Sequence, residues 1–307
     1  MLTNAEYSFK QAFLTFLKDV KSDVVIRAVA DALELRDFDR AFSIVNSYIA
    51  RFSVAVPEAF QQAASQEMVH AAEMLKPITG AVAIAFDPGN PAAAALMRRA
   101  QLQFIRDFSA EQRAATTRAL SDALATGAGP RQAAVAFRDS MGLTPYQQTV
   151  IGNYRRMLAN GESEALTRTI RDRRFDPTVR TAIRTGSSLS PEQIERMVNR
   201  YRERYLMLRA ETIARTESTR VTSLARREAF RQTVDDLGLD RSQIRRVWNA
   251  TNDGRTRDSH RDMDGQEVAF DAPFISGLGN RLMYPGDPSA PAEDVINCRC
   301  VVTNRVL

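Results

Sequence analysis

Two cysteines and a histidine near the end of the chain are the residues best suited to bind a metal ion. Cys298 and Cys300 are the only cysteines among the 307 residues, and His260 is one of two histidines. On a β-strand the two thiols would point to the same face, about 6 to 7 Å apart. Two sulfurs and an imidazole are ligands that zinc prefers, so these residues form a candidate zinc site. The candidates for a fourth ligand are Asp253, Asp258, Asp262 and Asp264.

The same residues also admit a structural interpretation. Cys298 and Cys300 share the expected strand face with Ile296 and Val302, and buried cysteines often pack as small hydrophobic groups. A disulfide across one intervening residue would be strained, so the thiols are expected to be reduced. As a general base, His260 would need an aligned nucleophile and an orienting group, and no catalytic motif is complete around it. We therefore expect no catalytic residues, and a polar network around His260 instead.

Three arginines in this region, Arg255, Arg257 and Arg299, are candidates for contacts with DNA. The chain carries a net charge of +5 and a pI of about 9.5, and most of its basic residues are arginines. Guanidinium groups pair with phosphate and with carboxylate, so ion pairs with aspartates such as Asp253 explain the arginines equally well. Trp248, the single tryptophan, is expected to anchor a small hydrophobic core.

The part of the chain that precedes this region is predicted to be helical. Within residues 1–80, apolar residues recur at spacings of three and four and form stripes. These stripes are expected to pack within the protein, with docking on another subunit as the alternative. Residues 80–95 are rich in glycine, proline and alanine and are the predicted linker.

Helix signals are clear in the middle of the chain. Capping boxes at Ser109, Thr144 and Ser190, with glycines between the segments, predict a series of short helices over residues 97–186. No helix breaker occurs between Pro191 and Leu237, so residues 191–237 are expected to form one long helix.

After Gly238 the hydrophobic period changes from that of a helix to that of a strand. Strands are expected at 244–250, 266–270 and 296–306, with loops between 271 and 295. The predicted fold is mainly α with a small C-terminal α+β domain. Its expected regions are 1–80 (helical), 97–186 (short helices) and 190–307, the last combining the long helix 191–237 with an α+β tip at 240–307.

No transmembrane or secretory segment is expected. The sequence has no run of about 18 apolar residues, and its first residues lack the basic start of a signal peptide. We therefore expect a protein made in the cytoplasm, with no membrane span.

The order of the C-terminal motifs resembles a known family. The chain reads A-R-T-E at 214–217, W-x-A-T-x-D-x-R-T-R-x-S-H at 248–260, D-G at 264–265, P-G at 285–286 and N-C-R-C at 297–300. This order is similar to the phage head morphogenesis domain of the Mu F-like family, the minor head proteins of tailed bacteriophages, over about residues 190–303. The motif residues carried over are Trp248, Asp253, Arg255, His260, Asp264, Gly265, Asn297, Cys298 and Cys300.

The resemblance implies a structural protein of the virion, located inside the head near the portal. It implies a role in head assembly, DNA packaging or DNA delivery, and no enzymatic activity. The implied partners are the portal protein and, beyond it, the major capsid or scaffolding protein and the packaged DNA. Two alternatives stay open: a DNA-binding protein of the virion interior, and a metal-dependent hydrolase or transferase that uses His260, Cys298 and Cys300. No cofactor is expected other than the candidate zinc ion.

Overall fold

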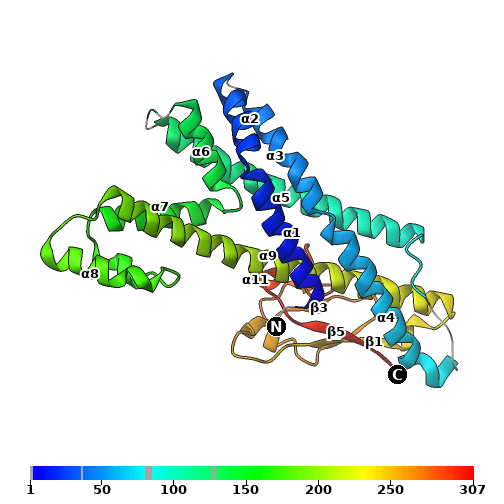
Figure 1. Cartoon of the computed structure of the whole chain (residues 1–307). Helices are drawn as coiled ribbons and strands as arrows, with labels where there is room; N and C mark the ends of the chain where they lie inside the picture. The colour runs from blue at the N-terminus through cyan, green and yellow to red at the C-terminus, as the bar shows by residue number, and fades with distance from the viewer. Residues whose placement is uncertain (1–2, 36, 80–84, 126, 128) are drawn as a thin grey trace. The chain divides into compact units, whose positions relative to one another are not determined.

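The computed structural model describes residues 3–35, 37–79, 85–125, 127 and 129–307 (Figure 1). Its contacts divide the chain into two compact units, each made of segments far apart in sequence. The first unit contains Met1–Ala12, Ser53–Phe104 and Thr212–Leu307, and the second contains Phe13–Phe52 and Ile105–Glu211. The sequence predicts three contiguous regions, 1–80, 97–186 and 190–307, whereas each contact-based unit combines separate segments. The boundaries of the three regions therefore stay a prediction.

The fold is mainly helical, as predicted. The helices α1 to α9 are Asn4–Val20, Asp23–Glu34, Phe38–Phe52, Ala55–Thr79, Pro91–Ala125, Pro130–Ser140, Pro145–Ala159, Asp176–Thr185 and Pro191–Asp236. The long helix expected at 191–237 is α9, with 46 residues. None of the helices in the described ranges is long and apolar enough to cross a membrane.

One helix prediction is wrong. Residues 97–186 were expected to contain only short helices, but α5 has 35 residues, and the capping box predicted at Ser109 lies inside it. Phe104 and Phe108 are both buried, so the apolar period continues into Ser109 without a glycine or proline to end the helix. The capping boxes at Thr144 and Ser190 do begin helices α7 and α9. Of the predicted linker, residues 80–84 lie outside the described residues.

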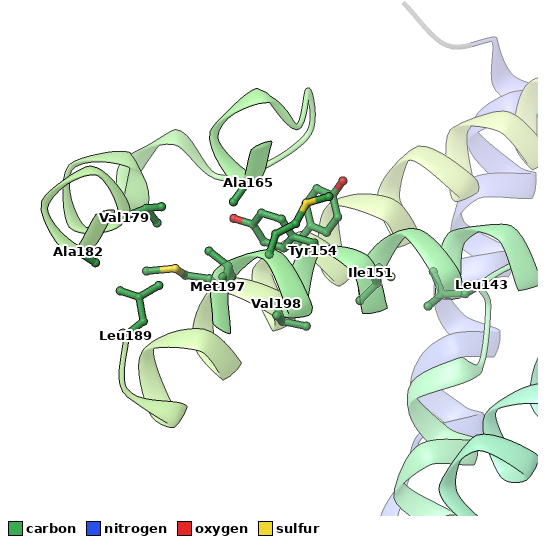
Figure 2. Packing of buried hydrophobic residues seen from close by; sticks show 12 residues of the cluster. Leu143, Ile151, Tyr154, Ala165, Val179, Ala182, Leu189, Met197 and Val198 are labelled. Carbon is green, nitrogen blue, oxygen red and sulfur yellow. The ribbon is translucent and has the colours of Figure 1, made fainter. Parts of the chain in front are cut away.

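The second unit has a hydrophobic core between α7, α8 and the start of α9 (Figure 2). The rings of Tyr154 and Tyr201 lie 4.3 Å apart there, between centroids. Phe13 and Phe16 from the predicted stripe in residues 1–80 are buried elsewhere in this unit against Phe108. These stripe residues therefore pack within the protein.

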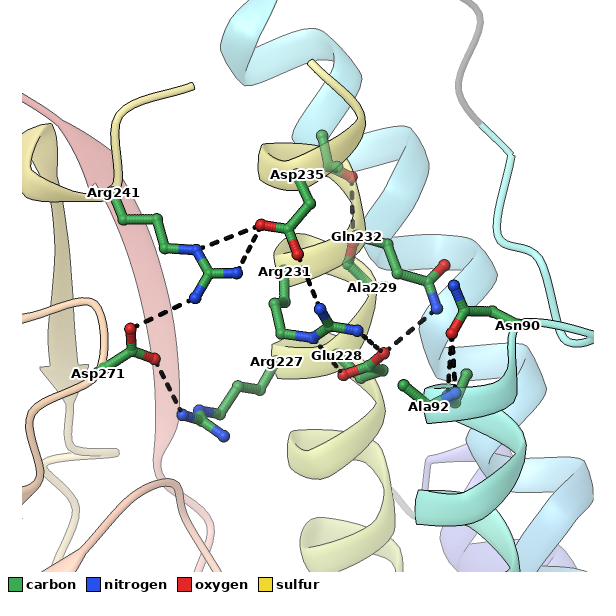
Figure 3. Close-up of polar contacts among 12 residues, drawn as sticks. Asn90, Ala92, Arg227, Glu228, Ala229, Arg231, Gln232, Asp235, Arg241 and Asp271 are labelled. Carbon is green, nitrogen blue, oxygen red and sulfur yellow. Dashed lines mark hydrogen bonds and ion pairs between the residues drawn. The ribbon is translucent and has the colours of Figure 1, made fainter. Parts of the chain in front are cut away.

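The first unit is organised around the second half of α9. Phe230 and Val234 pack with Ala71 of α4 and with Ile244 and Phe270 of the C-terminal part. Arg241, in the chain that follows the helix, forms an ion pair with Asp235 near the end of α9 (Figure 3). Within the helix, Arg231 pairs with both Glu228 and Asp235.

The C-terminal part of the first unit contains a three-stranded antiparallel sheet in the order β2-β1-β5. The strands are β1 (Ile244–Asn249), β2 (Glu267–Ala269) and β5 (Val301–Val306); β3 (Phe274–Ile275) and β4 (Arg281–Leu282) form a separate pair. Two short helices, α10 (Asp258–Arg261) and α11 (Ala292–Val295), complete this part. We call residues 240–307 the C-terminal module.

Candidate functional site

The turn that follows β1 is built by the D-G motif. Asp264 accepts hydrogen bonds from the backbone N–H of Ala250 at 2.8 Å and from the Asn252 side chain at 2.6 Å. Gly265 donates its N–H to the carbonyl oxygen of Trp248 at 2.8 Å. The indole of Trp248 is fully buried in the module's core, as expected. The motif residues Asp264 and Gly265 therefore position the loop that leads to His260.

Two of the three candidate DNA-binding arginines make contacts inside the module. Arg299 forms two hydrogen bonds with the carboxylate of Asp253, at 2.5 and 2.6 Å. Arg257 donates to the carbonyl oxygens of Glu293 and Ile296, at the end of α11. The Arg255 side chain is 77% exposed and lies 4.0 Å from Asp253.

The structure brings His260, Cys298 and Cys300 together. The Nδ1 atom of His260 lies 3.6 Å from Sγ of Cys298 and 3.4 Å from Sγ of Cys300. All three ligand atoms lie within 4.8 Å of one another, and all three residues are buried. The edge of the His260 ring meets Trp248, with centroids 5.4 Å apart. The candidate zinc ligands thus form one buried cluster.

A buried carboxylate lies on the other side of the imidazole. The Nε2 atom of His260 is 3.4 Å from Oδ1 of Asp294, an electrostatic contact that is not a well-aligned hydrogen bond. Asp294 also accepts hydrogen bonds from Ser259, Ser276 and Asn280, at 3.0, 2.8 and 2.9 Å. Burial alone would raise the pKa of Asp294, but these hydrogen bonds outweigh it and the pKa lies below its usual value. Asp294 is therefore ionised beside His260.

The two thiols are coupled to each other. The Cys298 thiol donates toward the sulfur of Cys300, which lowers the pKa of Cys300 and raises that of Cys298. Burial raises the pKa of both thiols, and His260 helps to lower that of Cys300. One sulfur of the pair is therefore easily ionised, which suits a metal ligand.

The element expected to carry the cysteines is different in the structure. A strand was predicted from 296, but β5 begins at Val301, and Cys298 and Cys300 lie in the segment that precedes it. Asn297 has a φ of 58°, and this left-handed conformation interrupts extended backbone. Ile296 is 44% exposed, so it does not share a buried face with the cysteines.

The four aspartates suggested as a fourth ligand do not join the cluster within the described part of the chain. Asp253 pairs with Arg299 and Asp264 holds the turn after β1, as described above. Asp258 accepts a hydrogen bond from Arg261 at 2.8 Å and is 92% exposed, and Asp262 is also exposed.

Helix α9 fixes the N-C-R-C segment through its A-R-T-E motif. Arg215 donates to the side-chain oxygen of Asn297 at 3.1 Å, and the N–H of Asn297 donates to Thr216 Oγ1 at 3.0 Å. Thr219 donates to the carbonyl oxygen of Cys298 at 2.9 Å. Two sequence motifs about 80 residues apart therefore form one contact surface.

The P-G motif also rests on α9. Gly286 has a φ of 80°, and a Cβ atom placed on it would lie 2.9 Å from Cα of Arg220. Backbone cannot yield as a flexible side chain can, so the contact requires glycine.

Three residues around the imidazole were not predicted from the sequence: Asp294, Ser276 and Asn280. Asp294 follows Glu293 in a stretch that was expected to be a loop, rich in acidic and small residues, and no local pattern distinguishes the two carboxylates. Ser259, which donates to Asp294, is the one member of this network that lies next to His260 in the sequence.

Residues 114–303, from within α5 to most of the C-terminal module, match the family model described as Phage Mu protein F like protein. The chain belongs to this family. The match begins at 114, well before the start near 190 that the motifs alone indicated.

Three relatives share shorter stretches. Minor head protein GP7 of Bacillus phage SPP1 is 32% identical over 96 residues, 31% of this chain and 29% of that protein. Uncharacterized protein YqbB of Bacillus subtilis (strain 168) is 30% identical over 96 residues, 31% of this chain and 30% of that protein. NAD(+)--arginine ADP-ribosyltransferase EFV of Enterococcus faecalis (strain ATCC 700802 / V583) is 36% identical over 88 residues, 29% of this chain and 17% of that protein. The chain thus spans less than a third of each relative's length, and no solved structure matches it.

Proposed function

We propose that this chain is a minor head protein of a tailed bacteriophage, which acts in head morphogenesis from a position inside the head, near the portal. The family match over residues 114–303 carries the proposal, and the similarity to the minor head protein of phage SPP1 supports it. The module's internal contacts agree with a structural role, because Asp253, Asp264 and Asn297 bind other parts of the same unit.

The partner that we propose is the portal protein of the same phage. Co-elution of the two purified proteins in size-exclusion chromatography tests this contact, with the major capsid protein as the comparison. Co-elution with the portal protein alone is expected. Binding to the major capsid protein alone would reject portal attachment and keep the chain as a head component. Binding to neither would contradict the proposal.

Contact with packaged DNA is a second candidate role. The net charge of +5 and the exposed side chain of Arg255 favour it. Phosphate contacts release counterions, so the affinity for DNA should fall steeply with salt. Replacing Arg255 by alanine should then lower the slope of log affinity against log salt by about 1. Affinity that does not change with salt would reject this role.

We propose that the chain has no catalytic site of its own. The support is the burial of His260, which is 2% exposed and whose two ring nitrogens face two thiols and a carboxylate. The relative named as an arginine ADP-ribosyltransferase aligns over 17% of its length. Incubation of this chain with NAD⁺ and an arginine substrate is therefore expected to give no ADP-ribosyl arginine. Product formed by the wild-type chain would overturn the proposal.

A further inference from the structure

The cluster formed by His260, Cys298 and Cys300 has the composition and spacing of a metal site. We propose that it binds a structural zinc ion, through Nδ1 of His260 and Sγ of Cys298 and Cys300. This site does not depend on the role proposed for the protein in the phage head.

The distances between the ligand atoms carry the first part of the argument. Zinc lies about 2.3 Å from a thiolate sulfur and about 2.0 to 2.1 Å from an imidazole nitrogen, with tetrahedral angles. These values place a sulfur and a nitrogen of the same site about 3.6 Å apart. Nδ1 of His260 lies 3.6 and 3.4 Å from the two sulfurs. The three atoms are therefore already spaced to hold one ion.

A metal ion would occupy the cluster more fully than hydrogen bonds between its members do. A neutral imidazole has one nitrogen that accepts and one that donates, and the accepting nitrogen has one lone pair. Two thiols face Nδ1 of His260, so at most one of them can donate to it at a time. A divalent ion satisfies the nitrogen and both sulfurs at once. Two thiolates also neutralise its charge, which a buried site requires.

Asp294 supplies the support that metal-binding histidines usually have. A histidine that binds zinc through one nitrogen commonly donates its other N–H to a carboxylate, which fixes the ring and its tautomer. Oδ1 of Asp294 lies 3.4 Å from Nε2, and Ser259, Ser276 and Asn280 hold this carboxylate in place. With its proton on Nε2, facing this carboxylate, His260 would present Nδ1 to the ion. A carboxylate is thus already placed on the far side of the imidazole.

The ligand set selects the kind of metal. Two thiolates and an imidazole favour zinc, whereas magnesium and calcium require oxygen ligands. Within the described residues, no further histidine, cysteine, aspartate or glutamate joins the group. The fourth position is therefore assigned to water or another small ligand. Exposed fractions of 2%, 2% and 4% for the three ligands favour a structural ion over a catalytic one.

The ion would link α10 to the segment before β5. His260 is on α10, and both cysteines lie before β5, in the segment that Thr216 and Thr219 hold to α9. Zinc would thereby connect α10, through His260, to the segment that is hydrogen-bonded to α9.

Metal analysis of the full chain tests the proposal. The reduced protein is purified without chelator, and zinc and protein are measured by elemental analysis. About one zinc per chain is expected. The metal-free protein should also take up Co²⁺ with sulfur-to-cobalt charge-transfer absorption, and should not bind Mg²⁺ offered alone. Reduced wild-type protein that takes up neither Zn²⁺ nor Co²⁺ overturns the proposal, whatever the variants do.

Variants locate the ion. His260→Ala and Cys300→Ser should lose the zinc, whereas His70→Ala, which changes the chain's other, exposed histidine, should keep it. Asp294→Asn should weaken zinc affinity by about 10 to 100-fold and leave the stoichiometry unchanged. Zinc that is retained in full by folded His260→Ala and Cys300→Ser proteins would place the metal elsewhere and contradict the assignment.

Discussion

Arg299 and Asp253 form a two-pronged ion pair, with Nη1 2.5 Å from Oδ2 and Nη2 2.6 Å from Oδ1. The pair joins the turn after β1 to the segment that carries both cysteines. Planar guanidinium and carboxylate groups meet here in the geometry that gives the strongest charge-assisted hydrogen bonds.

Breaking this pair should destabilise the C-terminal module. Asp253→Asn and Arg299→Gln are each expected to lower the Tm, because each leaves a partner without its counter-charge. The double variant should lose less than the sum of the two single losses, since both remove the same interaction. Thermal unfolding of all four proteins measures this coupling. Additive losses would mean that the pair contributes nothing as a unit.

Gly286→Ala should be among the most harmful glycine substitutions in the module. The added Cβ would lie 2.9 Å from the backbone of Arg220, and the residue has a φ of 80°. We expect a loss of at least about 2 kcal/mol in the free energy of unfolding. Gly279→Ala is the matched control, because Gly279 has a φ of 81° and open space around it. It should cost only the conformational strain, about 1 kcal/mol.

Equal losses in the two glycine variants, measured by urea unfolding, would show that backbone conformation alone explains the effect. The contact between the P-G motif and α9 would then contribute nothing to stability.

Thr219→Val removes the hydrogen bond from α9 to the carbonyl oxygen of Cys298. We expect a loss of about 1 kcal/mol and faster hydrogen exchange in residues 296–300. Thr222→Val is the control, because Thr222 donates to Ser218 within the same helix. Exchange at 296–300 should be unchanged in this control. If both variants raise it equally, the contact between Thr219 and Cys298 does not hold the segment.

In the second unit, Asp172 should make stability depend on acid pH. Its buried carboxylate accepts hydrogen bonds from Arg174, which lower its pKa below the ordinary value near 3.8 although burial opposes the shift. A lowered pKa means that the stabilisation is complete above the ordinary pKa and declines as the pH falls below it. Asp172→Asn should cost about 1 to 3 kcal/mol at neutral pH.

The cost of Asp172→Asn should therefore shrink as urea unfolding is repeated from pH 7 down to pH 3. Asp107→Asn is the control, since Asp107 forms an exposed pair with Arg106 and should change stability by less than about 0.5 kcal/mol. A cost that stays constant over this range would show that the charge of Asp172 is not its cause.

The parts of the fold that were predicted correctly have strong local signals. The long helix α9 begins at Pro191, whose ring fixes a helical φ, and ends just before Gly238, which adopts the left-handed conformation that closes helices. The alternation of buried and less buried residues in Ile244–Asn249 is also a local signal, and it places Trp248 in the core. The capping box at Ser109 failed because Ser-x-x-Gln also fits inside a helix, here one whose buried Phe104 and Phe108 continue the apolar period up to it.

The candidate site was predicted only in part. His260, Cys298 and Cys300 were named from their chemistry, and the structure places them together. The strand expected at 296 was wrong, because alternating apolar residues also occur in a loop and the left-handed conformation of Asn297 leaves little trace in sequence. Asp294 had no local signal, since its role depends on contacts with distant Ser276 and Asn280.

The protein composition of purified phage heads tests the proposed function most directly. Quantitative mass spectrometry of heads from the phage that encodes this chain should detect it in every preparation, in a constant ratio to the portal protein. Heads that contain the portal protein but lack this chain, although it is produced in the infected cells, would contradict the account.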